Sequence, residues 1–457
     1  MKATGATKEW AGRVFGGAQC GDRRLNDRLV SVAAAAASCP AGTVTAVIVP
    51  GAEREGAFRL LENSHVCAQT VSDAMCVSSV CACEDKYVFV AIDGCSLRLT
   101  DRVGGREVGG VGAWSQNGRG LQVVSALAVS WDGTPIGLVG QTFWARNKRK
   151  EKYRERHSME METRYGVELL REVHGRFLEY NPEVTPWFQL DRGYDVWPVL
   201  LEAVRNKMLI TVRAVYDRIV RQSRNEPKQY LIELAHAAPV LGTYRLQIPA
   251  RPGRPARLAQ MQVQARTVTL ELHTSSKHVD YVTINVVLTK ECSGDKPLTW
   301  MLLTTAPVDC LDDAMTVIAG YTTRWRIEEF HRAWKKGGCN VEDNQLRTHP
   351  AIVKWATILA AVAARAIRLT YLAREKPDLS ALEELSRDEI DGIIALLQPK
   401  GVKKGAKPTL VVAVGWIADL GGFAGKYSGK PPGPTVVARG LQKVEIAADV
   451  LKNMRKK

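Results

Sequence analysis

The stretch Tyr321-Thr-Thr-Arg-Trp-Arg-Ile-Glu-Glu-Phe-His-Arg-Ala-Trp-Lys-Lys-Gly-Gly338 carries the most informative pattern in the chain. Asp312 or Asp313 can cap a helix start before it, and the Gly337-Gly338 pair can end a helix, so we predict one helix between these limits. Helical spacing divides its side chains between two faces. The polar stripe holds Tyr321, Arg324, Glu328, Arg332 and Lys335. The opposite face, which we expect in the core, holds Ile327, Phe330 and Trp334.

The charges of this stripe have two interpretations. A solvated surface helix commonly carries oppositely charged side chains four residues apart, and that reading applies to any charged helix. Here, however, the stripe is mostly basic around the single acid Glu328. A carboxylate ringed by arginine and lysine also suits a metal ligand that lies beside a phosphate backbone. The helix pattern alone leaves both interpretations open.

Length and charge limit the classes of protein. The 457 residues suffice for two or three domains, and 46% hydrophobic and 24% charged residues are ordinary values for a globular protein. Lys and Arg exceed Asp and Glu by 63 to 48, which favours a polyanionic partner such as nucleic acid. The first residues lack the apolar core of a signal peptide, and no apolar run reaches about 18 residues. We therefore expect a cytoplasmic protein. Charge alone does not distinguish DNA from RNA or from an anionic membrane as its partner.

The ten cysteines do not follow the spacing of a metal site or a disulfide framework. Only Cys81 and Cys83 are close together, as a Cys-x-Cys pair, and the sequence contains no Cys-x-x-Cys and no histidine at zinc-ligand spacing. We expect all ten to be free and mostly buried thiols.

Residues 1–75 are predicted to form a helical domain. The segments Lys8–Phe15, Gly21–Ala37 and Glu53–Leu61 have helical spacing of apolar residues. Their arginines suit a domain that contacts phosphates, although solvated helix faces would have the same composition. The arginines are Arg23, Arg24, Arg28, Arg54 and Arg59.

Two continuous apolar runs, each ended by an acid, follow in the next part of the chain. Tyr87–Asp93 and Thr185–Asp191 are typical of strands buried on both faces. An α/β sheet usually builds its site where such strands end. Either aspartate alone could equally be a turn former or a helix cap. Between the two runs we predict a hairpin from Leu121 with its turn at Asp132-Gly133, and a charged helix over residues 150–180.

The remaining segments predict an α/β unit, a β insertion and further helices. A helix at residues 196–206 and a strand at 208–213 complete the α/β unit. Residues 225–308 show the alternation of strands, interrupted by the basic loop Arg251–Arg257. A helix is expected at residues 350–374, with the apolar run Trp355–Ala364 buried. A Pro/Gly/Lys-rich loop at 398–408 then separates a helical C-terminal segment.

The predicted strands and the predicted helix together single out three acids as candidate site residues: Asp93, Asp191 and Glu328. Hard carboxylate oxygens from separate elements can hold two Mg²⁺ ions about 4 Å apart for phosphoryl chemistry. A generic hydrolase could use similar acids, so this set alone does not define the reaction.

The spacing Tyr321-x-x-Arg324-x-x-x-Glu328-x-x-x-x-x-x-Lys335 resembles the Tyr-Arg-Glu-Lys signature of bacterial cut-and-paste DDE transposases, typified by the transposon-five transposase. The likeness extends to Glu9–Phe15, Gly21–Arg24 and Glu55–Arg59 in the N-terminal region, and to Leu420–Phe423 and Ala438–Gln442 near the C-terminus. It implies an α/β fold with an RNase H-like (retroviral-integrase) catalytic core that carries a β-strand insertion. The implied divisions are a helical end-recognition domain at 1–75, a catalytic domain at 76–372 with its insertion at 225–308, and a helical C-terminal dimerisation segment at 373–457.

The resemblance also assigns roles to residues. It makes Asp93, Asp191 and Glu328 the catalytic acids that bind two Mg²⁺ ions, for which Mn²⁺ would substitute. Tyr321, Arg324 and Lys335 would contact terminal phosphates, and Trp300 would stack on a flipped base, although a core aromatic is the ordinary interpretation of that tryptophan. Further DNA contacts are expected from Arg213, Trp325, Arg332, Arg23, Arg24, Arg54 and Arg59. The sequence departs from the transposon-five enzyme at Gly193, where that enzyme has an acid.

The expected activity is that of a homodimeric DNA transposase. The resemblance implies DNA and not a membrane as its partner, with the cytoplasmic protein associated with the nucleoid when it is bound to DNA. It would bind terminal inverted repeats, cut the ends by metal-dependent hydrolysis with a hairpin step, and join 3′-hydroxyl ends to target DNA. Two alternatives stay open on the sequence. One is a transposase-derived DNA-binding regulator without catalysis, and the other is a metal-dependent DNA endonuclease without strand transfer.

Overall fold

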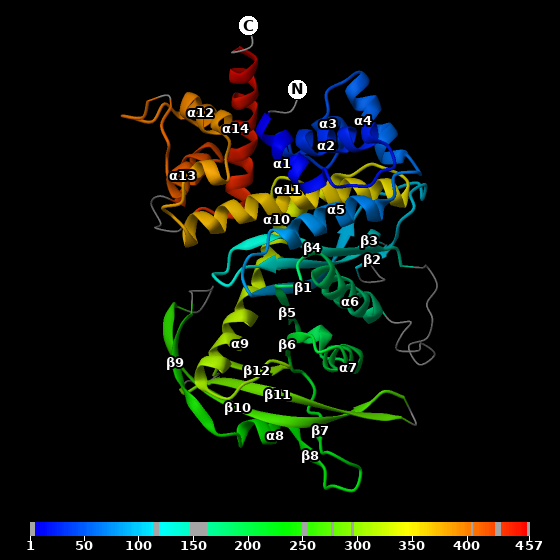
Figure 1. Cartoon of the computed structure of the whole chain (residues 1–457), viewed down its shortest axis with the longest axis vertical. Helices are drawn as coiled ribbons and strands as arrows, with labels where there is room; N and C mark the ends of the chain where they lie inside the picture. The colour runs from blue at the N-terminus through cyan, green and yellow to red at the C-terminus, as the bar shows by residue number, and fades with distance from the viewer. Residues whose placement is uncertain are drawn as a thin grey trace.

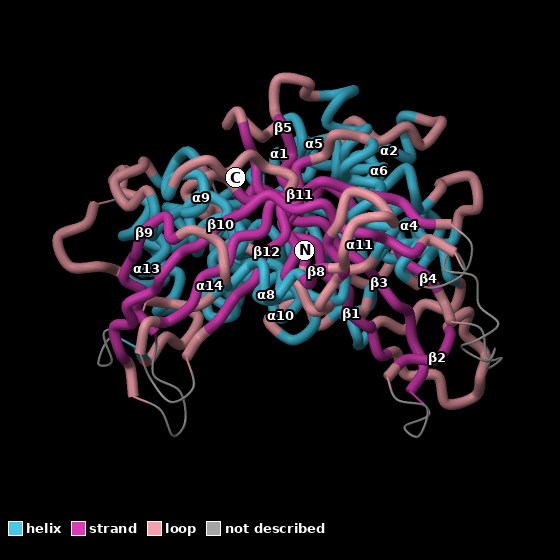
Figure 2. The backbone as a smooth tube through the Cα atoms, turned by 90° about the horizontal axis from the view of Figure 1, so that it is seen from below, coloured by secondary structure: helices cyan, strands magenta, loops and turns pink. Residues whose placement is uncertain are grey.

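A single mixed sheet runs through the molecule (Figure 1). Helices pack around its first half, and the strands of the β insertion extend it downward in this view. The structure is a computed structural model that describes residues 5–112, 118–146, 162–248, 255–275, 278–293, 297–403, 405–425 and 431–454. In that part of the chain the sheet has twelve strands, in the order β2-β3-β1-β5-β6-β12-β11-β10-β7-β8, with β4 paired to β3 and β9 to β10. Viewed from below, β9 and β2 lie at opposite sides of the molecule (Figure 2).

The first half of the sheet contains the two apolar runs that were predicted as buried strands. Its strands are β1 (Tyr87–Arg98), β2 (Gly109–Val111), β3 (Gly118–Val129), β4 (Pro135–Trp144), β5 (Thr185–Leu190) and β6 (Leu209–Arg213). β1, β5 and β6 are parallel to one another, whereas β3 is antiparallel to β1 and β4 is antiparallel to β3. The predicted hairpin is confirmed, because Asp132 accepts a hydrogen bond from the Thr134 amide at 2.9 Å in the turn that joins β3 to β4.

The predicted β insertion continues this same sheet and does not form a separate one. Its strands are β7 (Ile219–Val220), β8 (Gln229–Tyr230), β9 (Val240–Ile248), β10 (Arg257–His273), β11 (Val279–Glu291) and β12 (Thr299–Thr304). The connection is made by β12, which pairs antiparallel with β6 of the core. The insertion also contains a short helix, α8 (Leu231–His236), that we did not predict. Part of the basic loop, residues 251–254, lies outside the described residues.

The N-terminal part is helical, as predicted. Its helices are α1 (Gly5–Phe15), α2 (Arg23–Ser38), α3 (Val44–Val47), α4 (Ala52–Glu62) and α5 (Ala68–Cys81). α2 contains the alanine run and starts at Asp22, whose side chain accepts a hydrogen bond from the Arg24 amide at 2.7 Å. α5 crosses the division that we predicted at residue 75, so the helical region is continuous with the element that leads into β1.

Helices α6 (Thr163–Tyr180) and α7 (Trp197–Arg205) flank the parallel strands, and the N-terminal part of the predicted 150–180 helix lies outside the described residues. The remaining long helices are α9 (Leu311–Thr323), α10 (Trp325–Lys336), α11 (His349–Glu375), α12 (Arg387–Leu397), α13 (Leu410–Leu420) and α14 (Pro434–Met454). A short 3₁₀ helix, η5 (Val341–Asp343), follows α10.

α11 is the central helix of the molecule and packs against parts that lie far apart in the sequence. The buried Lys354 donates hydrogen bonds from Nζ to the carbonyl oxygens of Asn63 and Val66, both at 2.9 Å, and Trp355 donates one to the Gly42 carbonyl at 2.7 Å. On another side Arg365 forms ion pairs with Glu389 of α12 and Glu445 of α14. α11 is long and apolar enough to cross a membrane, but 89% of its most apolar window is buried inside the protein, so it is a core helix.

The cysteines are free, as predicted, but the expectation that most are buried is wrong. Cys20, Cys76, Cys83 and Cys339 are buried, two more are intermediate, and four are exposed. The exposed ones lie where helices or strands begin or end, for example at Cys67 and Cys310, which directly precede α5 and α9.

Candidate active site

Asp93 lies inside β1 and not at its end, which corrects our prediction. β1 continues to Arg98 because β3 pairs with it over that whole length, from Phe89 with Val129 to Arg98 with Gly120. The parallel partner β5, in contrast, ends at Leu190 opposite Ile92. Asp93 is therefore the first residue of β1 beyond the parallel pairing, which still places its carboxylate at the carboxyl edge of the parallel strands.

Asp191 directly follows β5 and begins a short 3₁₀ turn, η4 (Arg192–Tyr194). Its Oδ1 accepts a hydrogen bond from the Gly193 amide at 2.8 Å, so Asp191 acts as a cap as well as a candidate ligand. A Cβ atom at position 193 would lie 3.1 Å from that oxygen. Because residue 193 is glycine, the Asp191 carboxylate can occupy its observed position. A side chain at position 193 would crowd that carboxylate.

The helix that we predicted as continuous is two helices, α9 and α10, which meet at Arg324. The Thr322 and Thr323 hydroxyls donate hydrogen bonds back to the carbonyls of Ala319 and Gly320, at 2.6 and 2.7 Å. Such side-chain bonds compete with the helical backbone ladder, and the Arg324 amide instead bonds Tyr321 three residues before it. Asp313 takes part in the start of α9, as its carboxylate accepts from the Cys310 amide, and Gly337 ends α10.

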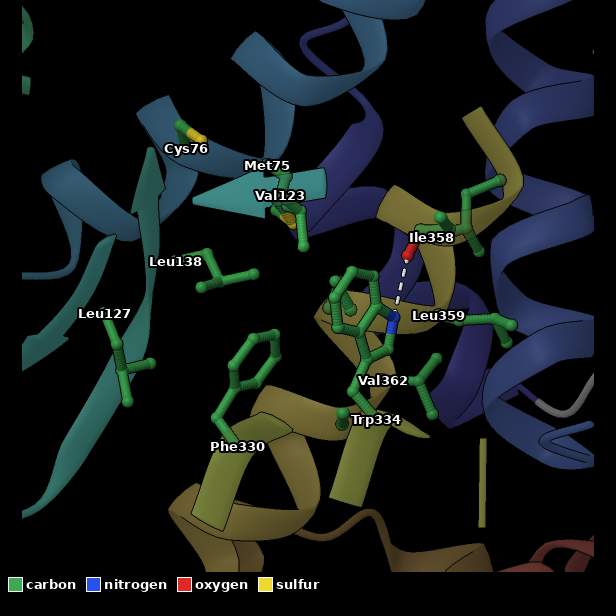
Figure 3. Close-up of a cluster of buried hydrophobic side chains, with 14 of the residues drawn as sticks. Met75, Cys76, Val123, Leu127, Leu138, Phe330, Trp334, Ile358, Leu359 and Val362 are labelled. Atoms are coloured by element: carbon green, nitrogen blue, oxygen red, sulfur yellow. Dashed lines mark hydrogen bonds between the residues drawn. The ribbon is translucent and has the colours of Figure 1, made fainter. Parts of the chain in front are cut away.

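The expected core face of α10 is confirmed. Ile327, Phe330 and Trp334 are fully buried. Figure 3 shows Phe330 and Trp334 packed between residues of α11 and of the sheet, and Trp334 donates a hydrogen bond from its indole nitrogen to the Ala356 carbonyl at 3.0 Å. This packing holds the opposite face of α10, with Glu328, toward the carboxyl edge of the sheet.

The three acids influence one another electrostatically. The pKa of Asp93 is raised to about 6, mainly by burial. The guanidinium of Arg324 acts in the opposite direction, and the carboxylates of Asp191 and Glu328 add to the rise. Arg324 Nη2 also lies 3.2 Å from Glu328 Oε1. Together with Arg324, the acids therefore form one charged cluster in which negative charge is incompletely compensated.

The chemistry of this cluster fits a divalent cation. Three carboxylates from separate elements are the oxygen ligands that Mg²⁺ and Mn²⁺ prefer. The pKa of Asp93 is raised mainly by burial and in part by the two other carboxylates, and a bound cation would favour its charged form. Among the described residues, however, no three His, Cys, Asp or Glu side chains already converge closely enough to hold an ion. Glu328 is instead paired with Arg324, and Asp191 Oδ1 accepts the capping hydrogen bond from the Gly193 amide.

Tyr321, Trp300 and Arg213 lie together beside the acids. The ring centroids of Trp300 and Tyr321 are 5.9 Å apart in an edge-on arrangement. Burial raises the pKa of the Tyr321 hydroxyl, whereas the nearby guanidinium groups of Arg324 and Arg213 lower it. Arg213 ends β6 and pairs with Leu302 of β12, two residues from Trp300. Four of the predicted DNA-contacting residues are thus adjacent in space.

Lys335 is engaged within the protein. Its Nζ donates a hydrogen bond to the Ser96 carbonyl at 2.7 Å and lies 3.2 Å from Glu342 Oε1. Glu342 also accepts a hydrogen bond from the Arg98 amide at 2.8 Å, which ties η5 to the end of β1. The lysine therefore lies near the acids but is already paired with a carboxylate that the sequence did not indicate.

The other predicted DNA-contacting residues lie on surfaces at different distances from the acids. Trp325 and Arg332 are exposed on α10, and Arg23, Arg24 and Arg59 are exposed on α2 and α4. Arg54 differs from them, because it donates hydrogen bonds to the carbonyls of Ile48 and Thr45 at 2.9 and 3.0 Å. Its guanidinium thus supports the end of α3 and has less freedom to reach a phosphate.

Two residues of the site were missed in the sequence. His331 Nδ1 lies 3.8 Å from Asp93 Oδ2, and burial lowers the pKa of His331 to about 3, so the imidazole is neutral. Burial, together with Asp93 and Asp191, raises the pKa of Tyr194. His331 is three residues after Glu328, and this helical spacing could have indicated that it lies near the acids. Tyr194 follows Asp191 by three residues, yet nothing in its spacing distinguished it.

A pocket of about 320 Å³ opens at this edge of the sheet. Its walls include Asp93, Asp191, Gly193, Tyr194 and Trp144. The pocket exposes the first two acids to a ligand that approaches from the carboxyl edge, whereas Glu328 is not one of the residues that line it.

Two parts of the chain match models of known protein families. Residues 7–66 match the transposase DNA-binding model, which covers α1 to α4. Residues 160–364 match the transposase DDE domain model, a range that contains Asp191 and Glu328 and that begins after Asp93. Together the two matches support a DDE transposase that joins a DNA-binding domain to a DDE domain.

Proposed function

We propose that this protein is a cut-and-paste DNA transposase of the Tyr-Arg-Glu-Lys group, similar to the transposon-five transposase. It binds the terminal inverted repeats of its element and cleaves the ends by metal-dependent hydrolysis with a hairpin step. It then joins the 3′-hydroxyl ends to target DNA. One observation carries this proposal: Asp93, Asp191 and Glu328 form one charged cluster beside Tyr321 and Arg324, in a chain that matches both transposase models.

The proposed metal ligands are Asp93, Asp191 and Glu328, with Mg²⁺ as the ion and Mn²⁺ as its substitute. Two such ions per site, when bound, would supply a nucleophile at neutral pH and stabilise the leaving oxygen. The protein's own contribution is to hold the carboxylates on three separate elements, β1, the β5–η4 junction and α10, and to keep Asp93 largely buried.

The cations and aromatic residues around the acids have distinct proposed tasks. Tyr321, Arg324 and Arg213 bind the terminal phosphates, because a phenol and two guanidinium groups meet there and form a concentrated donor set. Lys335 also binds a terminal phosphate once its ion pair with Glu342 is broken. Trp300 stacks on a base that is flipped out of the helix, which offsets part of the few kcal/mol that unstacking costs.

The fold supports an RNase H-like core. The strand order β4-β3-β1-β5-β6, with β3 antiparallel and β5 and β6 parallel to β1, brings two of the acids to adjacent strands. We further propose that residues 1–75 recognise the transposon end and that residues 373–457 provide the dimer contact of the synaptic complex. α11 continues to Glu375, past the proposed boundary at residue 373, so the C-terminal segment would be anchored in the catalytic domain.

The proposal requires a pair of inverted repeats in the DNA that flanks the gene. A duplex that carries one of these repeats is the substrate for the direct test. Asp93→Asn, Asp191→Asn and Glu328→Gln should each reduce cleavage of an end-containing duplex by at least about a thousandfold and leave its binding intact. The matched control is Glu329→Gln, since Glu329 adjoins Glu328 in sequence but is bound by the Tyr371 hydroxyl.

Each possible result has a clear meaning. Full cleavage by any of the three acid variants would refute the metal assignment. A wild-type protein that shifts the duplex and never nicks it in Mg²⁺ would be a DNA-binding regulator. A protein that cuts but gives no joined product when target DNA is supplied would be an endonuclease without strand transfer.

A further inference from the structure

The loop that follows β6, residues 214–218, leaves the sheet at the same edge as Asp191. β5 and β6 are parallel neighbours, so the segments after Leu190 and after Arg213 emerge side by side. Asp191 begins the first of these segments and the loop 214–218 begins the second. A nucleic acid that reaches Asp191 therefore passes close to this loop.

A buried carboxylate fixes the loop to the Asp191 segment. Asp195 is fully buried, and its Oδ2 accepts hydrogen bonds from the amides of Val215 at 2.7 Å and Tyr216 at 3.2 Å. Its Oδ1 accepts from Arg218 at 2.6 Å, and Arg218 also donates to the Asp195 main-chain carbonyl at 2.7 Å. Arg218 Nε donates one more hydrogen bond to Oδ1, so five hydrogen bonds in all join the loop to Asp195, the residue that follows η4. The loop is preorganised, not merely exposed.

This well-fixed loop nevertheless presents two large apolar side chains to solvent. Val215 and Tyr216 are 51% and 55% exposed. The guanidinium of Arg218 lies 5.3 Å from the centre of the Tyr216 ring, which limits the ring's freedom without covering it. An ordered and exposed aromatic ring near Arg213 resembles the surfaces on which unstacked bases pack, which combine aromatic and cationic side chains.

The position of the loop relates it to Trp300 and Arg213. The Ala214 amide donates a hydrogen bond to the Met301 carbonyl at 2.8 Å, which extends the pairing of β6 with β12 by one step. The loop therefore leaves the sheet beside the end of β12 that contains Trp300. Arg213, the residue before it, lies close enough to the Tyr321 hydroxyl to lower its pKa.

We propose that Tyr216 binds DNA by packing its ring against an unstacked nucleotide next to the scissile phosphate, and that Asp195 and Arg218 are the positioning residues that hold it there. This inference rests on the proposed transposase function and names a contact within that site. The ligand class is a nucleotide of the transposon end, recognised by its apolar face and its sugar and not by base-edge hydrogen bonds.

Photochemical crosslinking tests the contact directly. 5-Iodouracil is placed at each of the last few positions of a duplex that carries the inverted repeat flanking the gene, and the complex with the full-length protein is irradiated in EDTA. Trypsin cuts after Arg213 and Arg218, so the peptide Ala214–Arg218 contains Tyr216 as its one aromatic residue. We expect a crosslink in this peptide from one or two adjacent positions.

Affinity measurements with three variants complete the test. Tyr216→Ala should remove the crosslink and weaken binding of the duplex by roughly tenfold, in line with the loss of one stacked base. Tyr216→Phe should recover most of that loss. The control, Tyr180→Ala, removes an exposed tyrosine at the end of α6 and should bind as the wild type does.

The failures of the two proposals can be told apart. A shifted complex that never crosslinks through Ala214–Arg218, or a Tyr216→Ala variant with wild-type affinity, would overturn this inference alone. A wild-type protein that does not bind the end duplex at all would overturn the proposed function and this inference with it.

Discussion

Arg324 Nη2 lies 3.2 Å from Glu328 Oε1, so the third of the proposed metal ligands is already paired with a cation. The same guanidinium lowers the pKa of Asp93, which is raised overall by burial and by the other two acids. Arg324 therefore compensates part of the negative charge that a metal ion would otherwise neutralise. The proposed function requires the site to accept both metal and phosphate, and Arg324 would then change partners.

Substitution of Arg324 should consequently have opposite effects on metal and on DNA. Arg324→Gln removes a competing positive charge, and we expect the apparent Kd for Mn²⁺ to fall by several-fold in the absence of DNA. Cleavage of end DNA should fall by about tenfold or more, because a phosphate contact is lost. Mn²⁺ titration followed by electron paramagnetic resonance measures the first effect. Arg332→Gln, which removes an exposed arginine of the adjoining helix α10, should leave Mn²⁺ affinity unchanged.

The buried charge of Asp93 should reduce stability at neutral pH. Its pKa is about 6 in the folded protein against 3.8 for the free side chain, so folding costs more free energy once the group ionises. In EDTA, the free energy of unfolding should decrease as pH rises from about 4 to about 6. Asp93→Asn should be more stable than the wild type at pH 8, by up to about 3 kcal/mol, and equally stable near pH 4.

Urea unfolding across this pH range measures the difference. The control is Asp378→Asn, which removes an exposed carboxylate and should show no gain that depends on pH. A constant difference between Asp93→Asn and the wild type from pH 4 to pH 8 would contradict this account. Addition of Mg²⁺ at pH 8 should raise the stability of the wild type and not that of Asp93→Asn.

Removal of the Glu342 charge should strengthen DNA binding. Glu342 lies 3.2 Å from Lys335 Nζ, and Glu342→Gln keeps an oxygen that can accept from the Arg98 amide. The freed lysine can neutralise one more phosphate. We expect affinity for duplex DNA to rise by several-fold, and the dependence of log K on log salt to steepen by about one unit. Asp343→Asn, which changes an exposed neighbour, serves as the comparison; an equal gain there would indicate only a change in net charge.

Loss of the Asp195 charge should lower the stability of the protein. Removal of one partner from a buried ion pair leaves the other without compensation, and Asp195→Asn should reduce the free energy of unfolding by on the order of 3 kcal/mol. Glu55→Gln breaks an exposed pair with Arg59 and should cost less than about 1 kcal/mol. Equilibrium denaturation distinguishes the two, and similar costs for both would show that Asp195 does not anchor the loop.

Patterns within short segments were predictable, because they depend on neighbouring residues. The apolar runs before Asp93 and Asp191 indicated buried strands, and helical spacing correctly separated Phe330 and Trp334 from Glu328. The three acids could be assembled from these patterns and from the family resemblance.

What could not be predicted depends on partners that are distant in the sequence or on competition between bonds. β1 extends past Asp93 because β3 pairs with it, and that pairing has no signal in β1 itself. The break at Arg324 arises from two threonine hydroxyls that bond to backbone carbonyls, in a stretch whose apolar spacing is fully helical. Glu342 meets Lys335 only because the chain reverses at Asn340, which has a positive φ of 45°.

The burial of α11 on all its sides has a practical consequence for how the protein can be divided. α2, α4 and α5 cover parts of its surface from the N-terminal side, and α13 and α14 cover others from the C-terminal side. Removal of either terminal region would expose a long apolar flank of α11 to water. We expect fragments that lack either region to aggregate on expression, whereas co-expressed complementary fragments should remain in solution by burying that flank again.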